Sequence, residues 1–209
     1  MNKLKVLLLC LVAVTVTSMC PAAIITSVDR MYGQSGDRAP YGAFTGESDP
    51  LLGTLAVGEY VYSDREFRWV DVANLAGAEL VRTFNNDKAS SEIFVQYVVT
   101  VSRACTLALT IDDRIPEVQW SEAPSQQAAV DMVVQTWAPP GTFTDSGIDL
   151  FIDEANGPKF SVYTAEVEAG TYVFGLQPSN LNFYSIIAIP EPATLMLLGL
   201  GGLLLRKRR

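Results

Sequence analysis

Carboxylate side chains are the groups in this 209-residue chain that are most able to do chemistry. The chain contains 23 aspartate and glutamate residues and no histidine. The lack of histidine excludes Ser-His-Asp and Cys-His catalysis, histidine-ligated metals and the side chain that most readily acts as a base at neutral pH. No glycine-rich phosphate loop occurs either. The chemistry open to the chain is therefore that of oxygen ligands and carboxylic acids.

Two acidic turns could bring oxygen ligands together. Asp112 and Asp113 end one predicted strand, and Asp87 ends another. Turns that face each other on a β-sandwich can supply the oxygen ligands that Ca²⁺ prefers. Loop aspartates are also common for turn geometry alone, and here they could pair with Arg114 or Lys88. We favour the second interpretation. No cofactor is predicted, and the three aspartates remain candidate Ca²⁺ ligands.

A second acidic group, Asp145, Asp149, Asp153 and Glu154, does not have the spacing of an EF-hand loop and is predicted to be solvated surface. Two carboxylates about 5 to 9.5 Å apart in a cleft could hydrolyse a glycoside. Nothing in the sequence singles out such a pair, so no catalytic residue is predicted.

The three tryptophans could offer flat surfaces for sugar rings. Trp69 follows Phe67 by two positions, so both lie on one face of a predicted strand and are expected in the core. Trp137 lies in another predicted strand. Trp120 stands between two prolines in a loop and is the candidate for exposure and glycan binding.

Short alternating segments must position these side chains. Turn residues separate them at nearly even spacing, and no long segment has a period of 3.6 residues. This pattern predicts an all-β fold, an antiparallel jelly-roll-like β-sandwich over residues 59–189, after an irregular lead-in with a possible first strand at 23–58. The predicted strands are 24–28, 60–62, 67–72, 80–84, 93–101, 106–111, 130–137, 148–152, 160–167, 171–176 and 183–189.

The N-terminus has the form of a secretory signal peptide. Lys3 and Lys5 precede a helical apolar run at 6–16, and small residues follow. Cleavage by signal peptidase is predicted between Ala22 and Ala23, which removes residues 1–22. Lipidation at Cys20 is a minor alternative, because the residues before it fit a lipobox poorly.

The last twenty residues, 190–209, have three parts in a fixed order. They are a stiff break (Pro190, Glu191, Pro192), an uncharged apolar run (193–205) and a basic cluster (Arg206, Lys207, Arg208, Arg209). As a helix the apolar run would reach roughly 20 Å, short of a hydrocarbon core about 30 Å thick. The terminal cations should stay on the cytoplasmic side. A short helix of this kind favours transient retention at the inner membrane, and an ordinary tail anchor is the alternative.

This tail resembles the PEP-CTERM sorting signal of Gram-negative-type bacteria. The resemblance rests on the proline-bracketed motif, the apolar helix and the basic end, in that order. It implies recognition and tail removal by exosortase, a membrane-embedded cysteine protease, followed by delivery to the cell surface or extracellular matrix. It covers about a tenth of the chain and implies nothing about the chemistry of the body.

The body left between the two predicted cleavages is strongly acidic. Nine cationic and 22 acidic side chains remain in residues 23–189, a formal charge of −13, compared with −8 for the whole chain. Such a field repels nucleic acid and anionic lipid but allows divalent cations or a neutral glycan. Cys105 is the one cysteine left in this range and is predicted to pack in a strand.

The region from 77 to 187 resembles the galactose-binding-like jelly-roll modules of secreted bacterial proteins. The likeness lies in NNDK (85–88), DDRI (112–115), FSVY (160–163) and EAGTYVFG (168–175). The sequence therefore predicts an exported, tail-processed protein whose body interacts with extracellular matrix, such as the exopolysaccharide of a biofilm. The alternatives are a secreted polysaccharide-acting enzyme that uses carboxylates, and a structural filler without a ligand.

Overall fold

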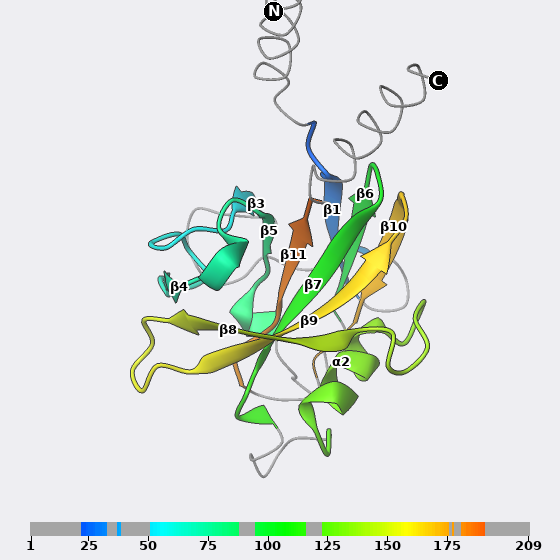
Figure 1. Ribbon diagram of the computed structural model, residues 1–209. Coiled ribbons are helices and arrows are strands. Elements are labelled where there is room, and N and C mark those ends of the chain that lie inside the picture. The colour runs from blue at the N-terminus through cyan, green and yellow to red at the C-terminus, as the bar shows by residue number, and fades with distance from the viewer. Residues whose placement is uncertain are drawn as a thin grey trace, which may run out of the picture.

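The body is a sandwich of two antiparallel β-sheets (Figure 1). The computed structural model of the protein describes residues 22–32, 37–38, 51–87, 95–115, 123–175, 177 and 181–190. Every strand pair between the named strands is antiparallel. The predicted all-β, jelly-roll-like sandwich is confirmed.

The smaller sheet has four strands, in the order β10-β6-β1-β2. Strand β1 pairs with β6 along its whole length, from Ile25 opposite Val101 to Tyr32 opposite Val95. The bounds are β1 Ile25–Tyr32, β2 Asp37–Arg38, β6 Val95–Val101 and β10 Gly170–Phe174.

The larger sheet has seven strands, in the order β3-β5-β11-β7-β9-β8-β4. This sheet curls, so that the chain following β3 passes beside β4, the strand at the opposite edge. There the Gly58 backbone amide donates to the Trp69 carbonyl at 2.8 Å. The bounds are β3 Leu51–Thr54, β4 Trp69–Asp71, β5 Glu79–Arg82, β7 Cys105–Asp112, β8 Thr144–Ile152, β9 Lys159–Val167 and β11 Ser185–Ile189.

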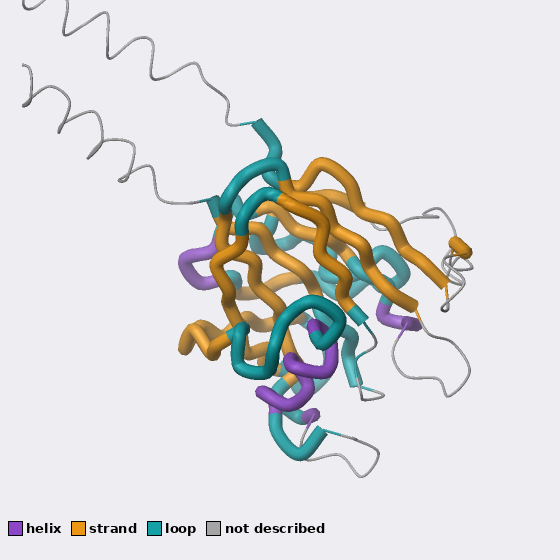
Figure 2. Tube along the Cα trace, turned by 90° about the vertical axis from the view of Figure 1, so that its right-hand side faces the viewer, coloured by secondary structure: helices purple, strands orange, loops and turns teal. Residues whose placement is uncertain are grey.

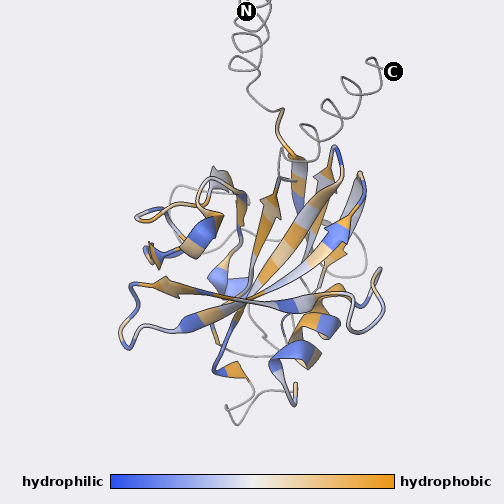
Figure 3. Ribbon diagram, viewed as in Figure 1, coloured by the Kyte–Doolittle hydropathy of each residue, from blue (hydrophilic) through white to orange (hydrophobic). Residues whose placement is uncertain are grey.

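Both faces of the larger sheet are covered. On one face the Tyr184 ring meets Tyr97 of the smaller sheet, with 6.3 Å between ring centroids. On the other face the sheet curls over itself, and Phe160 of β9 meets Trp69 of the edge strand β4 at 6.0 Å between ring centroids. The short helix η1 (Ala73–Leu75) follows β4. Seven of the eight residues of β7 are consequently buried, including Thr110 and Asp112, and apolar and polar residues are mixed along the strand (Figure 3).

Two predicted strands were wrong, 60–62 and 130–137. At 60–62 only an isolated bridge forms, between Tyr60 and Arg68. Residues Gln126–Val134 form the α-helix α2, which lies at the end of the body away from the start of β1 (Figure 2). The Ser125 hydroxyl caps it by accepting the Ala128 amide at 3.1 Å. Its buried residues, Ala129, Val130, Val133 and Val134, have the spacing of one helix face.

The predicted lead-in contributes more structure than one strand. Within residues 23–58, β1 lies inside the smaller sheet and β3 forms an edge of the larger one. The sandwich therefore begins at β1, ahead of residue 59. A further short helix, η2 (Asn85–Asp87), follows β5.

Candidate functional site

The predicted sorting motif begins where the fold ends. Strand β11 lies between β5 and β7, and its last residue, Ile189, is opposite Thr106. Ala188 is fully buried, Ile189 is half-buried and Pro190 is exposed. The rest of the tail, 191–209, lies outside the described residues, including Glu191, Pro192 and the basic cluster. No linker separates the last paired residue from the first proline.

The predicted N-terminal cleavage point lies at the same end of the sandwich. Ala22 and Ala23 are exposed, whereas Ile24 and Ile25 are buried. The amides of these two isoleucines donate to the two carboxylate oxygens of Glu79, each at 2.7 Å. Glu79 stands opposite Ala188 of β11. One side chain therefore holds the start of the body beside its last strand.

Asp87 is bound to a cation inside the protein. The Arg30 guanidinium forms an ion pair with it, and the exposed fractions of the two side chains are 5% and 3%. Arg30 Nε donates to Asp87 Oδ2 at 2.8 Å, and the Tyr97 hydroxyl donates to the same oxygen. Burial raises the pKa of Asp87, and the Arg30 guanidinium opposes that rise. Arg30 and Tyr97 surround the Asp87 carboxylate where a metal ion would have to bind.

Asp112 is the last residue of β7, and Asp113 begins the turn that follows it. Asp112 is fully buried and pairs with Arg114, whose Nε donates to its Oδ1 at 2.9 Å. This is one of the pairings predicted from the sequence. Asp113 instead accepts from the Ser161 hydroxyl at 2.7 Å.

The structure brings together a cluster that the sequence left scattered, which we call the polar shelf: Asp113, Asp149, Lys159 and Ser161. Lys159 Nζ lies 2.7 Å from Asp113 Oδ2 and 3.1 Å from Asp149 Oδ2. Hydrogen bonds that the Lys159 ammonium donates to Asp113 and to Asp149 raise the pKa of Lys159, so its ammonium stays charged. Ser161 Oγ reaches both carboxylates, at 2.7 and 3.3 Å. Paired β-strand positions 149 and 161 explain the gathering, and only strand register could have indicated it.

A second polar network was also missed. Asp64, which is fully buried, accepts the Asn85 and Asn86 amides at 2.6 and 2.9 Å and so caps η2. The side-chain amide of Asn182 donates to the Glu154 carboxylate at 2.5 Å. These residues are far apart in the sequence, and no local motif marks them. Their buried polar groups hold backbone turns in place.

The tryptophans divide as follows. Trp69 is buried, as predicted. Trp137 is half-buried among aromatic rings, and its centroid lies 4.7 Å from that of Tyr172. Trp120, the weak candidate for exposure and glycan binding, lies outside the described residues. Cys105, at the start of β7, is buried.

In the part of the chain that the structure describes, no three histidine, cysteine, aspartate or glutamate side chains lie close enough to hold a metal ion. The candidates Asp87, Asp112 and Asp113 each bind a different cationic side chain. Calcium binding by these residues stays the untested alternative to the ion pairs that the sequence favoured.

Comparison with known families identifies the tail. Residues 188–209 match the PEP-CTERM protein-sorting motif. The chain carries a PEP-CTERM tail. This motif is a signal for exosortase processing and indicates an exported protein that is processed at the membrane. Within the described residues, no helix is long and apolar enough to span a membrane.

The body has no comparably clear match. No curated protein matches the chain. Among solved structures it is similar to a GH138 enzyme targeting pectin rhamnogalacturonan II, with a TM-score of 0.45 and 10% sequence identity. The match covers 82% of this chain and 18% of that one. The chain thus spans less than a fifth of the length of that enzyme.

Proposed function

We propose that this is an exported protein whose PEP-CTERM tail is removed by an exosortase-type protease, leaving a β-sandwich body that binds extracellular matrix polysaccharide without catalysis. The observation that carries the proposal is the junction at Ile189 and Pro190. The last strand pair is complete one residue before the first proline of the motif. Tail removal therefore leaves every paired strand of the body in place.

The polar shelf supports polysaccharide binding. The side chains of Lys159 and Asp149 are about two-fifths exposed, at 42% and 38%. Together with Ser161 they offer donors and acceptors on one patch of a rigid sheet, as sugar hydroxyls require. The formal charge of −13 on residues 23–189 favours a neutral glycan over an acidic one.

The same geometry weighs against the enzyme alternative. A glycosidase leaves room between its two carboxylates for the glycosidic oxygen or a water molecule. Here the Lys159 ammonium lies between Asp113 and Asp149 and contacts both. The shelf is therefore suited to holding a polar ligand rather than to cleaving one.

The first experiment is the intact mass of the protein recovered from its native host. We expect residues 1–22 and the chain from about Pro190 onward to be missing, as signal peptidase and exosortase cleavage would leave it. A mass that retains 193–205 would contradict tail processing and favour the tail-anchor alternative.

The second experiment measures binding of the purified protein to the exopolysaccharide of the same host by co-sedimentation. Lys159→Gln should weaken binding, whereas Arg103→Gln, which removes a cation from the opposite end of the body, should leave it unchanged. If Lys159→Gln binds the exopolysaccharide as strongly as Arg103→Gln does, the ligand binds away from the polar shelf. If the protein releases reducing ends from the exopolysaccharide and Asp113→Asn abolishes this release, the enzyme alternative replaces the proposal.

A further inference from the structure

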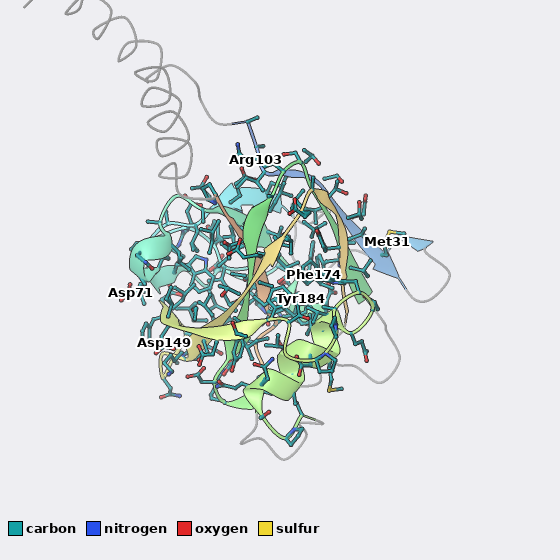
Figure 4. All side chains as sticks on the ribbon, turned by 45° about the vertical axis from the view of Figure 1, so that its right-hand side comes forward. Met31, Asp71, Arg103, Asp149, Phe174 and Tyr184 are labelled. Atoms are coloured by element: carbon teal, nitrogen blue, oxygen red, sulfur yellow. The ribbon has the colours of Figure 1, made fainter. Side chains whose placement is uncertain are left out.

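Both predicted processing points lie at one end of the sandwich. We call this the tail end and define it by Ala23, Ser102, Arg103, Ala169 and Pro190. Strand registers place these residues together, because the last residue of β11 pairs with the start of β7, and the end of β6 pairs with the starts of β1 and β10. Figure 4 shows Arg103 at this end and Asp149 far from it.

The connection from the body to the apolar run is very short. Three residues separate Ile189 from Ala193, where that run begins. Even fully extended, the steps from Pro190 to Ala193 span only about 10 Å. The polar layer on each side of a bilayer is itself about 5 to 7 Å thick. When the apolar run enters the hydrocarbon core, the tail end must lie in or against the headgroup layer.

The turns of the tail end carry no net formal charge, whereas the body as a whole is strongly acidic. These turns are built from small residues, with Arg103 and Glu168 as their charged side chains. Signal-peptide cleavage at the predicted bond would add the α-ammonium of Ala23. The acidic groups of the polar shelf lie at the other end of β9. Because juxtamembrane cations are attracted to anionic lipid, the tail end meets a bilayer with less repulsion than the shelf would.

We propose that, before the tail is removed, the folded body rests on the membrane with its tail end against the lipid headgroups. A membrane-embedded protease then acts on the junction at Ile189 and Pro190, which lies at the membrane surface because the tail end does. The polar shelf faces away from the bilayer throughout. This inference rests on the membrane stage of the proposed function, in which the PEP-CTERM tail enters the bilayer.

Two alanines provide matched positions for a test. Ala169 lies in the turn between β9 and β10, at the tail end, and Ala155 lies in the turn between β8 and β9. Both are exposed. Strand β9, nine residues long, separates the two turns by about 30 Å at roughly 3.3 Å per residue. Cys105 is buried, so a thiol-reactive fluorophore will label an introduced cysteine in the folded protein.

The protein without its signal peptide and with its tail intact, residues 23–209, is reconstituted into phosphatidylethanolamine–phosphatidylglycerol vesicles that contain a headgroup nitroxide lipid. This form lacks Cys10 and Cys20. The label on Ala169→Cys should be quenched relative to nitroxide-free vesicles, and the label on Ala155→Cys should not. Equal quenching at both positions, or none at either, would overturn the proposed orientation.

Flotation of the same vesicles separates this inference from the proposed function. Protein that fails to float has no tail in the bilayer, which contradicts both. Protein that floats without quenching at Ala169→Cys contradicts the orientation alone. A ten-residue Gly-Ser insertion between Ile189 and Pro190 should abolish the quenching while flotation persists, because the longer connection frees the body from the surface. Quenching that survives the insertion would mean that the short connection is not what holds the tail end to the lipid.

Discussion

Asp87 and Asp149 are both aspartates in ion pairs, but water reaches them very differently. Asp87 and its partner Arg30 are almost completely buried, whereas the side chains of Asp149 and Lys159 are 38% and 42% exposed. Exposed ion pairs add little to the free energy of unfolding, because water screens the charges and competes for their hydrogen bonds. A buried pair that loses one partner leaves an uncompensated charge in the interior. The two aspartates should therefore differ in their contributions to stability.

The residue-scale prediction compares Asp87→Asn with Asp149→Asn. The first keeps the shape of the side chain but removes the charge beside Arg30, and it should lower the free energy of unfolding by about 3 to 5 kcal/mol. The second should lower it by less than about 1 kcal/mol. Urea unfolding followed by tryptophan fluorescence measures both. Equal effects would mean that the Arg30–Asp87 pair does not stabilise the contact between η2 and β1.

At the scale of elements, α2 depends on a local signal and on a tertiary one. Ser125 caps its first turn, and Ala129, Val130, Val133 and Val134 bury one face of the helix. Because a nine-residue helix is marginal in isolation, packing against β7 and β10 supplies most of its stability. The C-terminal end of the helix is tied to the smaller sheet, where the Gly175 amide donates to the Val133 carbonyl at 2.7 Å.

The element-scale prediction concerns that cap. Ser125→Ala removes the side-chain acceptor of the Ala128 amide and should lower the free energy of unfolding by about 1 kcal/mol. Ser125→Asp, which preserves an acceptor and places a negative charge at the helix N-terminus, should restore it. Chemical denaturation measures both variants. A loss with Ser125→Asp as large as with Ser125→Ala would contradict the cap assignment.

At the scale of the whole molecule, three buried tyrosines link folding to alkaline pH. Tyr62 and Tyr184 donate to the backbone carbonyls of Phe183 and Gly175, at 2.8 and 2.7 Å. Burial raises the pKa values of Tyr62, Tyr97 and Tyr184 well above 10. Their phenolates therefore form only when the sandwich opens. Above about pH 10 the unfolded chain binds fewer protons than the folded one, so stability falls as pH rises.

The prediction for the whole molecule is the steepness of that loss. Each buried phenol should contribute up to about 1.4 kcal/mol per pH unit above about pH 10, or roughly 4 kcal/mol for the three together. Tyr184→Phe should reduce the slope by about a third. Urea unfolding of both proteins at a series of alkaline pH values measures how steeply the free energy of unfolding falls with pH. An unchanged slope in Tyr184→Phe would mean that Tyr184 can ionise without unfolding.

The sequence by itself determined the sorting tail of the protein and the class of its fold. The PEP-CTERM tail could be recognised because its signal is local, three adjacent parts whose order and composition carry the meaning. The strand-rich body could be predicted because alternation and turn residues are also short-range properties. The Asp112–Arg114 pair is a contact between close neighbours in the chain, and it was foreseen for the same reason.

Tertiary structure alone decided what long-range pairing controls. The segment at 130–137 mixes apolar and polar residues and was predicted as a strand, but residues up to Val134 belong to α2, which packs against β7 and β10. Strand register placed Asp149 opposite Ser161, and η2 reaches β1 through the Arg30–Asp87 pair. The closeness of Ala23 to Pro190 likewise follows from long-range contacts, because the Glu79 side chain binds the Ile24 amide and Glu79 is paired with Ala188 of β11. A linear sequence does not encode such distances locally, because they arise only when distant segments share a core.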